Sequence, residues 1–291
     1  MKSNHINQWF VHSLFILSTI ASLFPFMLLF MASITDEKSI IVDGYSIWPK
    51  IFSLDAYLFL LNDSTTMARA YGITIFITFV GTLIGLIIST LLAYPLSRND
   101  LPLRKTLSFL VFFTMLFHGG LVSTYLVYTE VFHLKNTILA LIVPGLLTNG
   151  FYILLIRSFF ATSIPVPVIE SAYIDGASEF RIFWNIVLPL SLPILAAIGL
   201  MLSISYWNDW FNGLIYVTDS KLFSIQNMLT RMMTDLQFLQ QSDMGAAAGA
   251  NIPTDTVRMA IAVIGILPIF CVYPFFQKYF VKGLTVGAVK G

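Results

Sequence analysis

The sequence has little charge for its length. Aspartate, glutamate, lysine and arginine make up only 11% of the 291 residues, hydrophobic residues make up 57%, and the mean hydropathy is +0.82. Soluble domains are about one quarter charged, and a chain this apolar would expose large hydrophobic patches to water. The composition predicts an integral membrane protein. The formal net charge of +1 also argues against nucleic acid as a partner, because nucleic-acid-binding domains carry basic patches.

Cysteine and the common catalytic motifs are also scarce. The single cysteine, Cys271, excludes an internal disulfide and a metal site built from a cysteine cluster. The sequence contains no GxxxxGKS or GxxxxGKT nucleotide loop, and no HExxH or Cys/His metal-ligand spacing. We therefore predict that this chain is not an enzyme and that it holds no catalytic residue, no metal and no cofactor of its own.

Long apolar runs are what the sequence has in abundance. A helix needs about 20 mostly apolar residues to cross about 30 Å of hydrocarbon, and six stretches qualify. They comprise residues 12–31, 71–94, 106–128, 137–156, 191–211 and 259–276. The first is too long for the core of a signal peptide and no small-residue cleavage site follows it, so we expect it to be retained. Residues 1–291 are thus predicted to form a single all-α membrane domain with six transmembrane helices.

The basic residues predict the orientation of these helices. Lysine and arginine gather on the cytoplasmic side of membrane proteins, and placing both termini in the cytoplasm puts most of them there. The inner segments then hold Lys2, Arg98, Arg104, Lys105, Arg157, Arg181, Lys278, Lys282 and Lys290. Residues 1–11 become a cytoplasmic N-terminus and residues 277–291 a cytoplasmic tail. Of the outer segments, 224–241 has apolar residues at helical spacing, which predicts a helix that packs on the outer mouth or contacts a substrate-delivery protein.

The inner segment 157–190 differs from the other inner loops in its length and punctuation. Pro165 and Pro167 should end the preceding helix, and short helices fit residues 168–175 and 177–187. Gly176 between them can adopt the left-handed conformation that reverses a chain. A partner that grips such a hairpin could transmit rigid-body motion to the flanking spans. An amphipathic hairpin resting on the membrane fits the composition equally well.

The residues of this segment resemble the EAA loop of ABC importer permeases. The matching positions are Glu170-Ser171-Ala172, Asp175-Gly176-Ala177-Ser178, Phe183, Ile186, Leu188-Pro189 and Pro193. The departure is Ser171, where the family usually has alanine. The resemblance implies the type I ABC importer fold, with the loop between helices four and five as a coupling helix docked on a separate ATPase subunit. The contact residues it implies are Glu170, Ala172, Asp175, Gly176 and Ala177, although Asp175 also suits a purely local turn.

The C-terminus carries a second resemblance. Residues 277–291, QKYFVKGLTVGAVKG, are similar to the tail of maltose-type carbohydrate permeases, and residues 253–280 resemble the branch for complex or acidic oligosaccharides. With the loop, the likeness covers nearly the whole chain. It implies that the tail reaches between two ATPase subunits through Gly283, Gly287, Lys290 and Gly291.

Polar residues inside the predicted spans are the candidates for a substrate path, because such groups are costly in a membrane and usually functional. Asn149 interrupts the fourth span, and Tyr206, Asn208 and Asp209 gather near the outer end of the fifth. Aromatic faces, amides and carboxylates suit sugar recognition. A Trp207–Trp210 belt at the membrane interface and an interhelical hydrogen bond from Asn208 remain alternatives.

The family likeness implies a complete mechanism. The chain would be the permease subunit of an importer in the bacterial inner (cytoplasmic) membrane, a multi-pass protein embedded in lipid, that moves a carbohydrate, expected to be an oligosaccharide, by alternating access. Its partners would be a second homologous permease, an ATPase dimer carrying ATP and Mg, and an extracellular or periplasmic substrate-binding protein. The alternatives are an integral-membrane glycan or lipid transferase, an ion-coupled transporter, and an ABC permease for a solute other than sugar.

Overall fold

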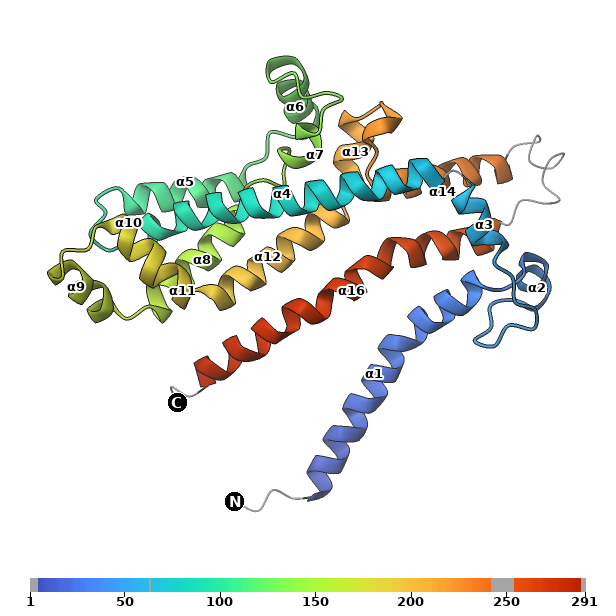
Figure 1. Cartoon of the computed structure of the whole chain (residues 1–291), viewed down its shortest axis with the longest axis horizontal. Helices are drawn as coiled ribbons and strands as arrows, with labels where there is room; N and C mark the ends of the chain where they lie inside the picture. The colour runs from blue at the N-terminus through green and yellow to red at the C-terminus, as the bar shows by residue number, and fades with distance from the viewer. Residues whose placement is uncertain (1–4, 63, 242–253, 289–291) are drawn as a thin grey trace. The chain divides into compact units, whose positions relative to one another are not determined.

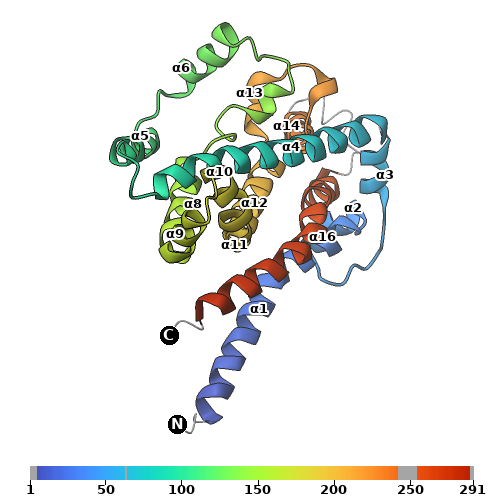
Figure 2. The same cartoon turned by 60° about the vertical axis from the view of Figure 1, so that its left-hand side comes forward.

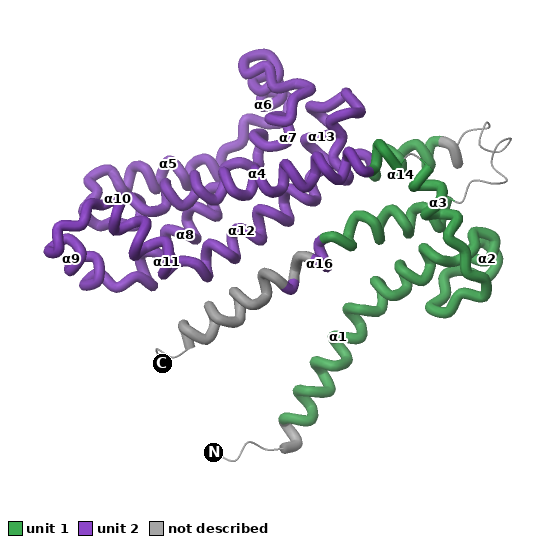
Figure 3. The backbone as a smooth tube through the Cα atoms, in the orientation of Figure 1, with its two compact units in different colours: residues 1–67, 229–268 green, residues 68–228, 269–291 purple. Residues whose placement is uncertain are grey.

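The computed structural model describes residues 5–62, 64–241 and 254–288, and their regular elements are helices (Figure 1). Extended pairing in these ranges is limited to one isolated bridge between Thr35 and Phe52. The all-α prediction is confirmed for this part of the chain. The chain divides into two compact units, residues 1–67 with 229–268 and residues 68–228 with 269–291 (Figure 3).

The first unit contains the N-terminal helix and the segments that follow it. Its elements are α1 (His5–Ser33), α2 (Glu37–Asp43), α3 (Asp55–Leu61), most of α14 (Ile225–Gln241) and the first half of α16 (Thr254–Ala288). α14 confirms the amphipathic helix predicted over 224–241, and its apolar face is buried at Leu229 and Leu236.

Within this unit, the Glu37 carboxylate caps the N-terminus of α16. It accepts hydrogen bonds from the backbone amides of Asp255 at 2.8 Å and Thr256 at 2.9 Å, and from the Thr256 hydroxyl at 2.6 Å. The first amides of a helix have no partner within the helix, and a negative charge there is favourable because of the helix dipole. Glu37 therefore ties α2 to the start of α16.

The second unit is built around α4 (Ser64–Ser97). After it come α5 (Arg104–Leu116), α6 (Leu121–Leu126), the π-helix η1 (Val127–Val131), α7 (Leu139–Ile142), α8 (Gly150–Ser163), α9 (Val166–Ile174), α10 (Glu179–Ile182), the π-helix η2 (Phe183–Val187), α11 (Leu188–Leu190), α12 (Leu192–Trp207), α13 (Phe211–Tyr216) and the short 3-10 helix η3 (Ser220–Leu222). α8 packs against both α5 and α12 (Figure 2). The unit is thus a layered helical bundle with α9 to α11 at one end.

Small residues let α4 approach its neighbours closely. Tyr206 of α12 is fully buried, and a Cβ added at Gly81 would lie 2.3 Å from the Tyr206 ring. A Cβ added at Gly85 would lie 2.9 Å from the Leu147 carbonyl oxygen. Membrane helices commonly pack through such small residues, because hydrocarbon gives apolar side chains little reason to associate. The two glycines fix how α12 and the segment before α8 lie on α4.

The first, second and sixth predicted spans coincide with long continuous helices, whereas the count of six spans stays a prediction. Three continuous helices are long and apolar enough to cross a membrane, Gln8–Ser33, Ser64–Ser97 and Thr254–Cys271, and the count rises to six when each of three bent helix pairs is taken as one span. The third predicted stretch is broken into two helical segments, α5 and Leu121–Val131. The chain bends by 111° between them. Gly120, with φ +82°, lies at this break.

The fourth predicted stretch differs most from the structure. Instead of one helix over 137–156, the short α7 is followed by a non-helical segment, and α8 begins at Gly150. Gly145 is in the left-handed region at φ +72°. The Asn149 side-chain oxygen accepts a 2.9 Å hydrogen bond from the Phe151 amide, which makes Asn149 the N-cap of α8. Local turn and cap chemistry therefore starts the helix later than hydropathy predicts.

Candidate functional site in the loop between α8 and α12

The chain reverses between α9 and α10 through a Schellman turn. Gly176 has φ +75°, which confirms the left-handed conformation predicted for it. The Ala177 amide donates to the Ala172 carbonyl at 2.9 Å, and the Gly176 amide donates to the Tyr173 carbonyl at 2.9 Å. These two bonds satisfy the last carbonyls of α9 and define the motif. The reversal therefore has one preferred geometry and presents α9 and α10 as a fixed pair.

The ends of the two helices differ from the prediction in detail. Pro165 follows the end of α8 and is the N-cap of α9, whereas Pro167 lies in the first turn of α9, where a missing amide costs nothing. The expected helix over 177–187 begins at Glu179, and its second half is the π-helix η2. Pro189 cannot donate to the carbonyl four residues before it, which favours a wider turn at this point.

The loop is anchored in the core of the second unit. Its buried side chains are Ala172, Ile182, Phe183 and Val187. They share one hydrophobic cluster with residues of three long helices: Ala93 and Leu96 of α4, Ile153, Ile156 and Phe160 of α8, and Ile198 and Leu202 of α12. Close-packed interiors transmit displacement because they deform little. The loop is therefore packed directly against α4, α8 and α12.

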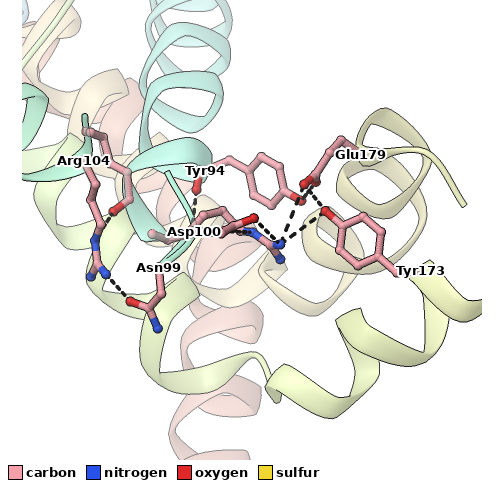
Figure 4. Close-up of polar contacts among 9 residues, drawn as sticks. Tyr94, Asn99, Asp100, Arg104, Tyr173 and Glu179 are labelled. Atoms are coloured by element: carbon pink, nitrogen blue, oxygen red, sulfur yellow. Dashed lines mark hydrogen bonds and ion pairs between the residues drawn. The ribbon is translucent and has the colours of Figure 1, made fainter. Parts of the chain in front are cut away.

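A polar group that we call the Arg98 bracket joins the end of α4 to this loop (Figure 4). It consists of Tyr94, Arg98, Tyr173 and Glu179. Glu179 accepts hydrogen bonds from the hydroxyls of Tyr94 and Tyr173. Arg98 donates to the Tyr173 hydroxyl at 3.2 Å, lies 3.7 Å from the Glu179 carboxylate, and has its guanidinium carbon 5.4 Å from the centre of the Tyr173 ring. The bracket holds α9 and α10 together and fastens both to α4.

Asp100 completes the charge pattern around Arg98. The Asp100 carboxylate accepts two hydrogen bonds from Arg98, both 3.1 Å long. This bidentate contact lowers the pKa of Asp100 from its ordinary value. Asp100 therefore keeps its charge to lower pH than a free aspartate and helps to hold the Arg98 guanidinium in place.

A second contact holds the same end of α4. The Leu96 carbonyl accepts hydrogen bonds from Nε of Arg104 at 3.1 Å and from Nε of Arg157 at 3.0 Å. Arg104 begins α5 and Arg157 lies in α8, so three helices meet at one carbonyl. The sequence marks these arginines only as inner charges, and this contact requires the fold to bring residues 61 positions apart together.

The structure divides the five predicted coupling residues into two groups. Ala172 is buried and Ala177 is partly buried against the same core. Glu170, Asp175 and Gly176 are exposed. Glu170 lines a cavity of about 520 Å³ together with Arg98 and Tyr173. The alanines thus face the protein, and the other three positions face outward.

The predicted substrate-path residues lie in different surroundings. Tyr206 is fully buried and donates a 2.9 Å hydrogen bond to the Ile142 carbonyl. The side-chain amide of Asn208 donates a 2.9 Å hydrogen bond to the Ile204 carbonyl, one helical turn earlier in the chain. Asp209 accepts a 3.2 Å bond from the Asn212 amide, while its second carboxylate oxygen is buried and has no partner among the described residues. Asn149 and His118 line a cavity of about 620 Å³.

The predicted tail contact lies largely outside the described side chains. Gly283 and Gly287 are within the backbone of α16, so the tail begins as a continuation of that helix. Lys290 and Gly291 lie outside the described residues. The contact with an ATPase therefore stays a prediction.

These features define an integral membrane protein of several helical spans, with a rigid helical loop anchored across its bundle. Residues 85–286 match the family described as the inner membrane component of binding-protein-dependent transport systems. The chain belongs to this family and is a multi-pass protein of the bacterial inner membrane. That membership sets aside the glycan or lipid transferase and the ion-coupled transporter.

Individual relatives match over nearly the full length. Protein LplC of Bacillus subtilis (strain 168) is 39% identical over 270 residues, covering 93% of this chain and 90% of LplC. The polygalacturonan/rhamnogalacturonan transport system permease protein YtcP of the same organism is 36% identical over 290 residues, covering 99% of both chains. A crystal structure of a bacterial ABC transporter involved in the import of the acidic polysaccharide alginate contains a chain that is 29% identical, with TM-score 0.80 over 96% of this chain and 98% of that one. The fold is that of an ABC importer permease.

Proposed function

We propose that this chain is one of two permease subunits of an ABC importer that carries an oligosaccharide into the cytoplasm, and that the α9–α10 loop is its contact with an ATPase. The observation that carries the proposal is the Schellman turn at Gly176, which presents Glu170 and Asp175 at the surface while Ala172 faces the core. The family resemblance of these positions supports the same assignment.

The coupling follows from how the loop is held. An ATPase dimer that closes on ATP would displace α9, and the core around Phe183 and the Arg98 bracket would carry that displacement to α4, α8 and α12. Rigid-body movement of packed helices is a common form of conformational switching. Alternation between outward-open and inward-open states follows when a second permease moves in the opposite sense. ATP and Mg belong to the ATPase, and a substrate-binding protein delivers the sugar from outside.

An acidic oligosaccharide is the substrate class that the relatives favour. YtcP is named for polygalacturonan and rhamnogalacturonan, and the structural relative is an importer of alginate. Of the predicted residues we assign Asn149, Asn208 and Asp209 to the path, because Tyr206 is fully buried with its hydroxyl bonded to the Ile142 carbonyl. Asn149 lines a cavity, and one carboxylate oxygen of Asp209 has no partner among the described residues. Both side chains can form hydrogen bonds with sugar hydroxyls.

The test is co-purification of the ATPase combined with uptake. Glu170→Ala and Gly176→Pro should each reduce recovery of the ATPase with this chain and abolish or strongly reduce ATP-driven uptake. Asp55→Ala is a matched control, because it removes one exposed acidic charge from the segment predicted to lie outside. Unchanged ATPase recovery in both loop variants would contradict the docking role, and uptake of an uncharged, non-sugar solute by the intact complex would contradict the substrate class.

A further inference from the structure

A basic cavity lies where the α4–α5 loop meets α8. Its volume is about 710 Å³, and Arg104, Lys105, Arg157, Ser108, Asn99 and Asp100 are among the residues that line it. It is distinct from the cavity beside Glu170, although the two share Asn99 and Asp100. Three cationic side chains, those of Arg104, Lys105 and Arg157, thus surround one cavity.

These cations are not neutralised within the described part of the chain. Nε of Arg104 and Nε of Arg157 are used at the Leu96 carbonyl, and Arg104 also donates to the Asn99 side chain. None of the three cations forms an ion pair among the described residues. The acid that lines the cavity, Asp100, is already held by two hydrogen bonds from Arg98. The cavity therefore carries an excess of positive charge.

The N-terminus of α5 adds to this charge. α5 has 13 residues, its N-cap Leu103 provides no side-chain hydrogen bond, and its first turn contains no acid. Apart from the Arg104 amide, which donates to the Leu101 carbonyl at 3.2 Å, the first amides of the helix and the positive end of its dipole favour an anion at this position. One turn further on, the Ser108 hydroxyl is shielded from solvent and has no partner among the described residues. Cations, helix amides and a hydroxyl form a complementary set for a phosphate group.

The apolar surroundings indicate where the phosphate comes from. Leu103, immediately before α5, is 61% exposed, and Phe109 and Phe113 on the same helix are 59% and 42% exposed. Arg104 and Lys105 stand at the start of the apolar stretch 106–128, at the depth of lipid headgroups in the orientation predicted from the basic residues. Basic pockets beside cytoplasmic helix ends bind anionic headgroups, and an exposed aromatic helix face suits acyl chains.

We propose that this cavity binds the phosphate of an anionic phospholipid from the cytoplasmic leaflet. The headgroup lies against Arg104, Lys105 and Arg157, with the Ser108 hydroxyl as a further donor, and the acyl chains run along α5. Because Arg104 and Arg157 also hold the Leu96 carbonyl, an occupied site reinforces the junction of α4, α5 and α8. The leaflet assignment rests on the predicted orientation, whereas binding can be measured without transport.

Native mass spectrometry of the protein, purified with its accompanying subunits in nanodiscs, tests the site. Discs of phosphatidylglycerol and of phosphatidylcholine are compared, and the bound lipid is counted after release from the disc. Wild type should retain phosphatidylglycerol preferentially. Lys105→Gln, which breaks no described hydrogen bond, should weaken retention about fivefold, the effect of roughly 1 kcal/mol for one cation near an anionic surface, and Lys105→Glu should weaken it further.

Lys135→Gln is the matched control, because it removes an exposed lysine from an outer segment and should leave retention unchanged. Equal retention of the two lipids by wild type, or wild-type retention of phosphatidylglycerol by Lys105→Glu, would overturn the proposal. A third arm adds inorganic phosphate to the phosphatidylglycerol discs. Displacement of the lipid by millimolar phosphate would overturn the lipid as the source and assign the site to a soluble anion.

Discussion

The Tyr94 hydroxyl donates a 2.5 Å hydrogen bond to Oε2 of Glu179, although the two residues are 85 positions apart. Tyr94 is near the end of the longest helix of the second unit, and Glu179 begins the second helix of the candidate coupling loop. The Tyr94 ring also contacts the rings of Phe160 and Phe183, with centroids 6.5 and 5.0 Å away. One side chain thus links α4 to α8 and to the loop.

Tyr94→Phe should weaken this link without removing the ring contacts. A hydrogen bond to a charged group contributes about 1.5–3 kcal/mol, and partial exposure here reduces that to about 1 kcal/mol. We expect a thermal midpoint lower by a few degrees and less substrate imported per ATP hydrolysed. Tyr152→Phe is the control, because the Tyr152 hydroxyl forms no hydrogen bond to another helix among the residues that the structure describes. An unchanged ratio of transport to hydrolysis in Tyr94→Phe would refute the coupling role of the bracket.

Gly176→Ala tests the turn between the loop helices. With φ +75°, a side chain at this position costs about 1–2 kcal/mol, although no atom lies within 4 Å of the added Cβ. The variant should lose about that much stability, while Gly176→Asn should lose less because asparagine tolerates the left-handed region. Gly72→Ala also adds a methyl group in open space, but in a helix, where stability should rise slightly. Equal effects of the two alanine variants would show that the turn conformation is unimportant.

Local signals in the sequence predict part of this site. Some features depend only on the conformation or hydropathy of their own segment, so the sequence alone predicts their roles. They are Gly176, Pro165 and the apolar run of α12. α8 begins 13 residues later than the predicted start at 137 because Asn149 caps it. Hydropathy averaged over a window does not reveal that one asparagine within an apolar run starts a helix.

The Arg98 bracket could not be predicted in the same way. Arg98 reads as one inner cation among several, and its partners Tyr173 and Glu179 lie 75 or more residues further along the chain. Only packing of α9 and α10 against the end of α4 brings them together. The sequence likewise places the three cations of the basic cavity on the cytoplasmic side. That they line one cavity depends on how α5 and α8 pack together.

Gly81→Ala should destabilise the second unit strongly. The added methyl group would lie 2.3–2.6 Å from three atoms of the Tyr206 ring, and that ring is fully buried with its hydroxyl bonded to Ile142. Overpacking of this kind costs about 1–3 kcal/mol. The double variant with Tyr206→Leu should recover part of the loss, because the ring is removed. Thermal unfolding in detergent provides the measurement, and a Gly81→Ala midpoint equal to that of Gly72→Ala would contradict the close contact.

Glu37→Ala should loosen the start of α16. The Glu37 carboxylate accepts from the Asp255 amide and from the amide and hydroxyl of Thr256, so its removal leaves several donors of a helix N-terminus without a partner. Loss of an N-cap costs about 0.5–2 kcal/mol, and loss of a charge at the positive end of the dipole adds a few tenths. Asp43→Ala is the matched control, because Asp43 pairs with Lys50 at the surface, where such a pair contributes about 0–1 kcal/mol. Hydrogen exchange at residues 255–258 should speed up in Glu37→Ala and stay unchanged in Asp43→Ala. Exchange that is equally slow in both variants would mean that the cap does not stabilise α16.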